Sequence, residues 1–266
     1  MMPDLRSLLD RHPALKALAR RLLRPLRGRR GVSSHYLEIA ASEALAPAHP
    51  LHQSWKHGDL PDRQRHLVDG QLAEYRVGRP VRVFDCLVDC LRALPDKGGA
   101  TLLEVGCSSG YYSEVLRLAG FAFQYTGCDY SPAFIELARA CHPEAMFAVG
   151  DATRLDYADE AFDTVVSGCC LLHIPDYQTA VAETARVARH HAIFHRTPVV
   201  VGQPDRFYRK QAYGVETIEI HFNEPAFLEL LQSCGLEVLD TRTLDESILA
   251  GKGGAVRTYV CAKKAH

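Results

Sequence analysis

Short apolar runs alternate with amphipathic stretches from residue 100 onward, and this rhythm constrains the fold more than any other feature. Strands that alternate with helices form a mostly parallel sheet whose two faces are both covered by helices. We therefore predict an α/β fold, a doubly wound sheet of seven strands. We expect strands at 101–106, 123–129, 145–149, 163–168, 192–197, 236–243 and 256–262, and helices at 110–119, 132–141, 177–189 and 224–234.

The chain before this region is predicted to be a helical N-terminal extension. A PDKGG run at 95–99 breaks the chain and marks a boundary. We therefore expect two domains, a helical cap at 1–95 and an α/β domain at 96–266. A polar linker at 49–59 carries the only tryptophan. Within the extension we predict helices at 33–46, 61–77 and 81–94.

Residues 1–30 hold most of the positive charge. They contain nine Lys and Arg against two Asp, a net charge of +7, whereas the remaining residues sum to −8. Leucines recur between the arginines at helical spacing, a pattern typical of a helix that lies on an anionic membrane. A helix whose leucines pack on the α/β domain, with its arginines solvated outside, is the stronger alternative. Nucleic acid is a weaker one, because the rest of the chain is acidic.

Cysteine usage and hydropathy indicate a cytoplasmic protein. The nine cysteines form no Cys-x-x-Cys pair and have no zinc-finger spacing. We read them as reduced thiols, most of which lie in apolar runs. No apolar run reaches the roughly 18–20 residues that cross a bilayer, and the start lacks the features of a secretory signal. We expect any peripheral contact with an anionic membrane to involve residues 1–30.

The run EVGCSSGY at 104–111 joins the first predicted strand of the sheet to the first helix. Ligands of doubly wound sheets bind beyond the carboxyl ends of the strands. A dinucleotide loop needs three glycines, but here the positions hold Gly106, Ser108 and Tyr111, and the tyrosine obstructs close packing of helix on strand. A nucleoside triphosphate loop is also absent. An adenosyl ligand without phosphates remains.

Four segments in this order resemble the motifs of class I S-adenosylmethionine-dependent methyltransferases, of the small-molecule, methyltransferase type 11/25-like kind. The resemblance covers residues 98–266. It implies a Rossmann-like fold, S-adenosylmethionine as cofactor and S-adenosylhomocysteine as product. The segments are EVGCSSG at 104–110, YTGCDYS at 125–131, GDA at 150–152, and FDTVV at 162–166 with LLH at 171–173.

The resemblance also implies a role for single residues. Glu104 supports the loop, while Gly106 and Gly110 let the backbone approach the methionine portion of the cofactor. Asp129 is expected to accept both ribose hydroxyls, with helix capping as the alternative. Asp151 is expected to accept the adenine amino group, with a turn as the alternative. The predicted cofactor-binding residues are Glu104, Gly106, Cys107, Gly110, Tyr111, Asp129, Tyr130, Asp151, Ala152 and Cys169.

The ends of the fourth and fifth predicted strands argue against a metal. Mg²⁺ requires oxygen ligands, but these ends read SGC at 167–169 and RTP at 196–198. The signatures of DNA amino-, cytosine C5- and protein arginine methyltransferases are missing as well. We therefore expect no metal, and a small-molecule, sugar or lipid-linked glycan acceptor, with O-methylation favoured over N-methylation.

Histidine is the natural general base for a hydroxyl acceptor near neutral pH. His173 follows the fourth predicted strand, and His221 lies in a 198–223 insertion that we expect to fold over the site. His195 lies within the fifth predicted strand. For each, a hydrogen-bonded histidine that only shapes the pocket is an equal alternative. Aromatic side chains that could line an acceptor pocket are Trp55, Tyr111 and Tyr213.

Two other functions stay open at this point. A protein that binds S-adenosylmethionine as a regulator or scaffold, without transferase activity, would keep the same glycine loop. An NAD-dependent oxidoreductase is a third hypothesis and predicts nicotinamide binding. The identity of the acceptor and the oligomeric state cannot be predicted from this sequence.

Overall fold

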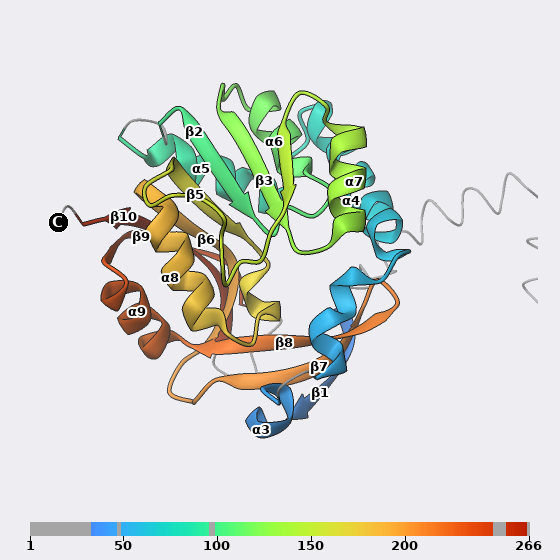
Figure 1. The fold of residues 1–266 in the computed structure, drawn as a ribbon, viewed down its shortest axis with the longest axis vertical. Helices are drawn as coiled ribbons and strands as arrows, with labels where there is room; N and C mark the ends of the chain where they lie inside the picture. The colour runs from blue at the N-terminus through green and yellow to red at the C-terminus, as the bar shows by residue number, and fades with distance from the viewer. Residues whose placement is uncertain (1–32, 47–48, 96–98, 247–253, 265–266) are drawn as a thin grey trace, which may run out of the picture. The chain divides into compact units, whose positions relative to one another are not determined.

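A ten-stranded sheet organises the part of the chain that the computed structural model describes, residues 33–46, 49–95, 99–246 and 254–264 (Figure 1). Six strands run parallel, and the last strand of the chain is antiparallel to both of its neighbours. The seven predicted strands are thereby confirmed as one continuous part of this sheet. In spatial order they are β4 (Met146–Val149), β3 (Gln124–Asp129), β2 (Thr101–Val105), β5 (Phe162–Gly168), β6 (Ala188–Val200), β10 (Gly254–Lys263) and β9 (Leu236–Asp245).

Three further strands extend the sheet beyond the carboxyl end of β6. The strands β7 (Arg206–Ala212) and β8 (Val215–Asn223) form an antiparallel hairpin, and β8 continues the sheet by pairing with the last residues of β6. The 198–223 insertion is therefore an extension of the sheet, and the expectation that it folds over the site stays a prediction. Strand-forming residues and a tight turn at 213–214 make this insertion part of the sheet.

The first described segment is a correction. We predicted a helix over 33–46, but β1 (Ser33–Ile39) pairs with β7, and only the short helix α3 (Ala41–Ala44) follows. The open edge of the hairpin offers unpaired backbone groups, and pairing with them outweighs the local helical spacing. The linker at 49–59 is more regular than expected, because it contains the 3-10 helix η1 (Pro50–Lys56).

Helices cover both faces of the sheet (Figure 1). The helices on one face pack into one hydrophobic core cluster. The helices on the other face pack, together with the hairpin, into a second hydrophobic core cluster. Neighbouring residues of β2 show the division, because Leu102 packs in one cluster and Leu103 in the other. The first face carries α4 (Leu60–Arg76), α5 (Arg82–Ala93), α6 (Tyr111–Leu118) and α7 (Pro132–Cys141), and the second carries α8 (Tyr177–Val187) and α9 (Glu224–Ser233).

The helices predicted at 61–77 and 81–94 are α4 and α5, and both pack in the same core as α6. Residues 35–266 form one compact unit. The boundary predicted at 95–96 stays a prediction. The basic leucine-rich helix predicted for 1–30, with its proposed membrane contact, lies outside the described residues.

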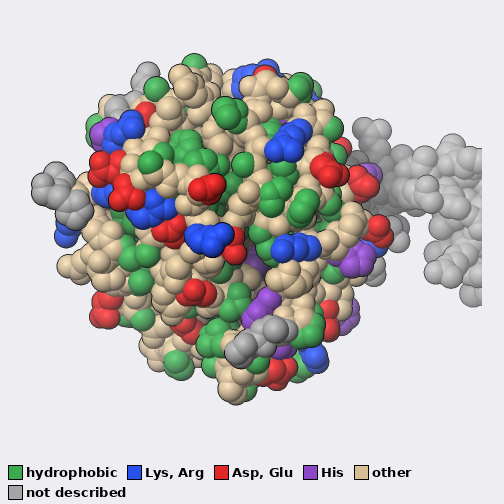
Figure 2. Space-filling model, in the orientation of Figure 1, with side chains coloured by type: hydrophobic (Ala, Val, Ile, Leu, Met, Phe, Trp, Pro, Cys, Tyr) green, Lys and Arg blue, Asp and Glu red, His purple; other side chains and the backbone are tan. Residues whose placement is uncertain are grey.

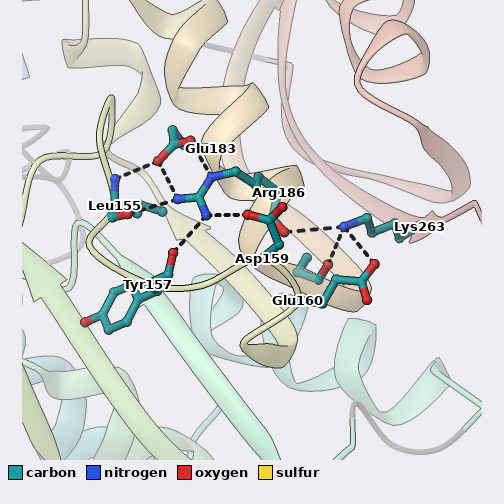
Figure 3. A network of polar contacts seen from close by, with 8 residues as sticks. Leu155, Tyr157, Asp159, Glu160, Glu183, Arg186 and Lys263 are labelled. Carbon is teal, nitrogen blue, oxygen red and sulfur yellow. Dashed lines mark hydrogen bonds and ion pairs between the residues drawn. The ribbon is translucent and has the colours of Figure 1, made fainter.

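The loop between β4 and β5 is fastened by one arginine on α8 (Figure 3). Arg186 donates to the carbonyl oxygens of Leu155 (2.9 Å) and Tyr157 (2.8 Å) and to the carboxylate of Asp159 (2.8 Å). Glu183 accepts two bonds from the same guanidinium, at 2.7 and 2.8 Å, and one from the Leu155 amide at 2.7 Å. The loop that starts with the predicted adenine-binding segment is thus held at its far end.

The surface mixes charges of both signs. Figure 2 shows Lys and Arg side chains interspersed with Asp and Glu over the face that it draws. Within the described ranges, no helix is long and apolar enough to span a bilayer. The nine cysteines are free thiols.

Candidate cofactor and acceptor site

The loop between β2 and α6 can be built only with glycine at two positions. Gly106 has a φ of 75° and Gly110 a φ of 70°, in the left-handed region. A Cβ on Gly106 would lie 2.3 Å from the Cβ of Cys170, and one on Gly110 would lie 2.5 Å from the Cζ of Phe147. The Gly106 amide also donates to the Cys128 carbonyl at 2.8 Å, so the loop is bonded to β3. The turn therefore brings the amino end of α6 to the carboxyl edge of the sheet.

Asp129 is the last residue of β3 and connects the glycine loop to α7. Its Oδ2 accepts from the Ser108 amide at 3.0 Å, and its Oδ1 accepts from the Ser131 amide at 2.9 Å. The side chain is buried, and burial raises its pKa to about 6. A carboxylate has about four acceptor positions, so two bonds leave capacity for a ligand. The bond to Ser131 closes a turn just before α7 and reaches no amide of the helix itself, so the capping alternative and the ribose role both stay predictions.

A hydroxyl in the glycine loop is buried without a hydrogen-bond partner. Among the described residues, Ser109 Oγ makes no such bond, and the first turn of α6 begins two residues later. The leading N–H groups of a helix have no partner within the helix, and they favour a negative charge. The loop thus offers donors that fit the carboxylate of a methionine moiety.

Glu104 lies on β2, directly before the loop. It is fully buried, accepts a short hydrogen bond from the Tyr125 hydroxyl, and has a pKa that burial raises to about 8. A Cβ on Gly168 would lie 2.6 Å from Glu104 Oε1, so β5 also packs closely on this carboxyl. This position suits the predicted role of supporting the loop, which stays a prediction.

The segment predicted to bind adenine lies at the surface. Asp151 is exposed and accepts from the Thr153 amide at 2.9 Å and from the Thr153 hydroxyl at 2.7 Å. These bonds are those of the turn that we weighed as the alternative. Ala152 is half-buried and packs against the core. Its contact with adenine, like that of Asp151, stays a prediction.

Two of the predicted cofactor residues are cysteines, and they differ in burial. Cys107 is buried beneath the loop, where burial raises the pKa of its thiol. Its Sγ contacts the Ser108 carbonyl at 3.8 Å. Cys169 follows β5, is half-buried, and has a φ of 63°. A reactive cysteine needs a lowered pKa, so we assign to Cys107 a packing role.

Two tyrosines connect the glycine loop and β3 to the N-terminal segment. The Tyr130 hydroxyl accepts from the Trp55 amide at 3.1 Å and donates to the His52 carbonyl at 3.3 Å. These bonds hold η1 against the end of β3. Tyr111 opens α6 and is almost fully buried, with its ring centroid 5.9 Å from that of Phe84 on α5. Residues before 96 therefore contribute to the surroundings of the glycine loop.

His173 lies in η2 (Leu171–His173), after β5, beside two aromatic rings. Its ring centroid is 4.6 Å from that of Trp55, which is 6.1 Å from that of Tyr213. His173 Nδ1 is 2.6 Å from the Ile218 carbonyl oxygen. Because a carbonyl only accepts, Nδ1 carries the proton and Nε2 keeps the lone pair. Burial lowers the pKa of His173 to about 3, so the ring is neutral near pH 7.

His221 belongs to a buried ionic network within the hairpin. Its Nε2 is 2.7 Å from the Glu219 carboxylate, which forms a short ion pair with Lys210. Tyr36 on β1 also donates to Glu219, at 3.3 Å. Burial alone would raise the pKa of Glu219, but Lys210 and His221 outweigh it and hold the pKa at about 2. The contacts of His221 match the alternative of a structural histidine, and its role as a base stays a prediction.

The structure adds residues that the sequence analysis did not single out. The Lys210–Glu219 pair and the guanidinium of Arg196 lie near His173, whose pKa both Lys210 and Arg196 lower. Side chains alternate between the two faces of strand β8, so Glu219 and His221 lie on the same face. This spacing of two residues is the signal in the sequence that could have shown them together. No comparable signal in the sequence points to Arg196. Within the described part of the chain, no group of acidic, histidine or cysteine side chains has the arrangement of a metal site.

Residues 103–195 match the family model described as a methyltransferase domain. Over 96 residues the chain is 35% identical to a phthiotriol/phenolphthiotriol dimycocerosates methyltransferase of Mycobacterium tuberculosis, covering 35% of this chain and 36% of that protein. It is 29% identical over 136 residues to a demethylmenaquinone methyltransferase of Renibacterium salmoninarum, covering 48% and 55%. The chain thus spans between about a third and about half of the length of these relatives.

Solved structures confirm the predicted α/β, Rossmann-like fold. The 1,6-didemethyltoxoflavin-N1-methyltransferase of Burkholderia thailandensis, solved with 1,6-didemethyltoxoflavin and S-adenosylhomocysteine, aligns with 88% of this chain and 99% of its own. The TM-score is 0.54 at 18% sequence identity, so this likeness concerns the fold.

Proposed function

We propose that this protein, whose α/β domain is a class I S-adenosylmethionine-dependent methyltransferase domain, transfers a methyl group to a small-molecule, sugar or lipid-linked acceptor. The observation that carries the proposal is the arrangement at the carboxyl edge of the sheet. The glycine loop and Asp129 follow β2 and β3, and His173, with its free lone pair, follows β5 beside them. Relatives named for phthiotriol dimycocerosates and for demethylmenaquinone support an acceptor of this small-molecule class.

The residues of the glycine loop fit the cofactor. When bound, S-adenosylmethionine supplies a methyl group on a positively charged sulfur. Asp129 keeps acceptor positions for the ribose hydroxyls, and Ser109 Oγ with the first turn of α6 offers donors to the methionine carboxylate. We propose that Asp151 and Ala152 hold the adenine. The loop that follows them is kept in place by Arg186.

On the acceptor side, we propose that His173 accepts the proton of the acceptor hydroxyl through Nε2. A neutral ring with a low pKa is a weak base, so its first effect is to orient the hydroxyl by a hydrogen bond. Positioning of the two reactants then supplies much of the rate. Trp55 and Tyr213 form an aromatic border on this side. We propose O-methylation without a metal ion.

Calorimetry and turnover test this proposal together. Wild-type protein is expected to bind S-adenosylmethionine and S-adenosylhomocysteine but not NAD, and to release S-adenosylhomocysteine with hydroxylated small molecules as acceptors. His173→Ala should lower kcat by roughly 10²–10⁴ with S-adenosylhomocysteine affinity nearly unchanged. His66→Ala, at an exposed position on α4, is the matched control and should leave both unchanged.

Three results would contradict it. Binding of NAD in place of S-adenosylmethionine would favour an oxidoreductase. Cofactor binding with no turnover on any acceptor of the panel would favour a protein that binds S-adenosylmethionine without transferring its methyl group. A loss of less than tenfold in His173→Ala would leave catalysis to positioning and remove the base from the mechanism.

A further inference from the structure

Arg196 lies near the carboxyl end of β6, at the edge of the sheet that also carries the glycine loop and His173. The preceding residue, His195, pairs with Gly168 at the end of β5. Arg196 and Cys169 both have a φ of 63°, a conformation that residues other than glycine rarely adopt. The Cys169 amide donates to the His195 carbonyl at 3.0 Å, which ties these two backbone segments together. Strained backbone of this kind clusters at functional sites.

The guanidinium of Arg196 differs from those of the other described arginines. Four of them, Arg82, Arg117, Arg154 and Arg196, have no hydrogen bond or ion pair from the guanidinium to another described residue. The first three are exposed, so water solvates them, whereas Arg196 is half-buried. A guanidinium stays charged at any physiological pH and carries five donors. Because Arg196 is only half-buried and its guanidinium has no partner among the described residues, its donors stay available to an anionic ligand.

The surroundings of this guanidinium are aromatic and come from both sides of the site. The pKa of Arg196 is raised most by Cys169, and Tyr111, Tyr112 and Tyr213 raise it further. Burial acts in the opposite direction and lowers it. Tyr111 and Tyr112 begin α6 after the glycine loop, and Tyr213 lies in the turn of the hairpin. Arg196 therefore lies between the predicted cofactor loop and the aromatic border of the acceptor side.

We infer that Arg196 binds an oxyanion of the acceptor, a carboxylate or a phosphate, so that the substrate is an acid with an apolar or aromatic body. This inference rests on the proposed function, because it names the acceptor of that reaction. The planar fork of the guanidinium matches a carboxylate or phosphate with two parallel hydrogen bonds. The tyrosines and Trp55 would contact the apolar body of the same molecule.

The methionine carboxylate of the cofactor is the other source of the same chemistry. The first turn of α6 and Ser109 already provide donors for that group. Arg196 has Tyr111 and Tyr112 of α6 on one side, but Cys169 after β5 and Tyr213 of the hairpin turn lie on its other side, towards His173. We therefore assign the anion to the acceptor, and the experiment below separates the two sources.

Isothermal titration of wild type, Arg196→Gln and Arg196→Lys tests this assignment. The first arm measures S-adenosylhomocysteine and 5′-methylthioadenosine, which lacks the amino-acid group. The second arm uses protein saturated with S-adenosylhomocysteine and measures 4-hydroxybenzoate, phenyl phosphate and the neutral 4-hydroxybenzamide. Arg154→Gln is the matched control because its guanidinium is exposed and equally unpaired among the described residues. Thermal melting checks that each variant is folded.

We expect S-adenosylhomocysteine affinity to stay within about twofold in Arg196→Gln, while the affinity for 4-hydroxybenzoate or phenyl phosphate falls by about tenfold or more. Arg196→Lys should lose less, since it keeps the charge, and the benzamide should bind all variants alike. A tenfold loss of S-adenosylhomocysteine binding, with 5′-methylthioadenosine unaffected, would overturn the assignment and place the cofactor carboxylate on Arg196. Equal binding of acid and amide to wild type would also overturn it, whereas failure of wild type to bind S-adenosylhomocysteine would overturn the proposed function itself.

Discussion

Buried carboxyl groups at the cofactor edge and in the hairpin differ in how their charge is balanced. At the cofactor edge, burial raises the pKa of Glu104 to about 8 and that of Asp129 to about 6. In the hairpin, Glu219 is equally buried, yet Lys210 and His221 outweigh burial and hold its pKa at about 2. Among the described residues, no cation forms an ion pair with Glu104 or Asp129.

The hairpin carboxylate has cationic partners within the fold, whereas the two carboxyl groups at the cofactor edge form no ion pair among the described residues. The hairpin balances its own charges, so its polar groups hold β1, β7 and β8 together. At the cofactor edge Asp129 accepts two hydrogen bonds, which leaves acceptor positions that a donor-bearing ligand can use. A ligand that binds the folded state alone also stabilises it by mass action. The four tests below address this comparison, and they are ordered by the size of the expected effect.

Removal of the hairpin carboxylate should have the largest effect. Glu219→Gln removes the buried carboxylate that pairs with Lys210 and contacts His221, and we expect the free energy of unfolding to fall by about 3–5 kcal/mol. Urea unfolding followed by circular dichroism measures this loss. Glu216→Gln is the control, because its pair with Arg209 at 3.6 Å is exposed and should matter by less than about 0.5 kcal/mol. Equal losses in both variants would show that the hairpin network is not what stabilises this region.

Removal of the carboxylate at the end of β3 should act on ligand binding. In Asp129→Ala the two ribose hydroxyls lose a charged acceptor, worth roughly 1.5–3 kcal/mol per bond, so S-adenosylmethionine affinity should fall at least tenfold. Calorimetry measures the loss, and Asp129→Asn, which can still accept from one backbone amide, checks for distortion of the loop. Asp151→Ala should cost less, because that side chain is exposed. Unchanged affinity in Asp129→Ala would remove Asp129 from the site.

The raised pKa of Glu104 predicts a pH dependence of stability that is opposite in sign to that of Glu219. Between about pH 4.5 and 8 the folded state holds the Glu104 proton more tightly than the unfolded state, so stability falls as pH rises. The lowered pKa of Glu219 has the opposite effect, because the folded state favours the ionised carboxylate. Its contribution to stability is lost as pH falls from about 4.5 towards 2. Glu104→Gln should reduce this fall in stability between about pH 4.5 and 8, which is at most about 1.4 kcal/mol per pH unit.

Urea unfolding of wild type and Glu104→Gln at pH 5, 6, 7 and 8 measures this effect. The gap between the two curves should widen in favour of the variant as pH rises. Parallel curves would mean that Glu104 is not protonated in the folded protein, and the contrast between the two regions would then rest on Asp129 alone.

Chelation should have the smallest effect. The described residues at the ends of β5 and β6 include no carboxylate, so excess EDTA should leave the transferase rate unchanged. The rate of S-adenosylhomocysteine release with and without EDTA measures this. A loss of activity that Mg²⁺ restores would show that acidic groups outside the strand ends hold a metal, and the proposal of a metal-independent reaction would be wrong.

Local patterns made much of the fold predictable. The strand, glycine turn and helix at 101–118 follow one another within a few residues, and glycines occupy two of the left-handed positions of the turn, Gly106 and Gly110. The seven core strands and the helices at 61–77 and 81–94 were predictable for the same reason. Strand β1 was not, because its pairing with β7 joins residues such as Glu38 and Arg206, far apart in the chain.

What the sequence determined by itself was therefore the order of elements and the loop chemistry, including the positions of Gly106, Gly110 and Asp129 at the cofactor edge. Only the tertiary structure decided how the charged groups are compensated: that Lys210 and His221 balance Glu219, and that Arg196 is half-buried without a partner among the described residues. The physical reason is that backbone conformation depends on near neighbours in the chain, whereas burial and electrostatic pairing depend on side chains that the fold brings together from distant segments.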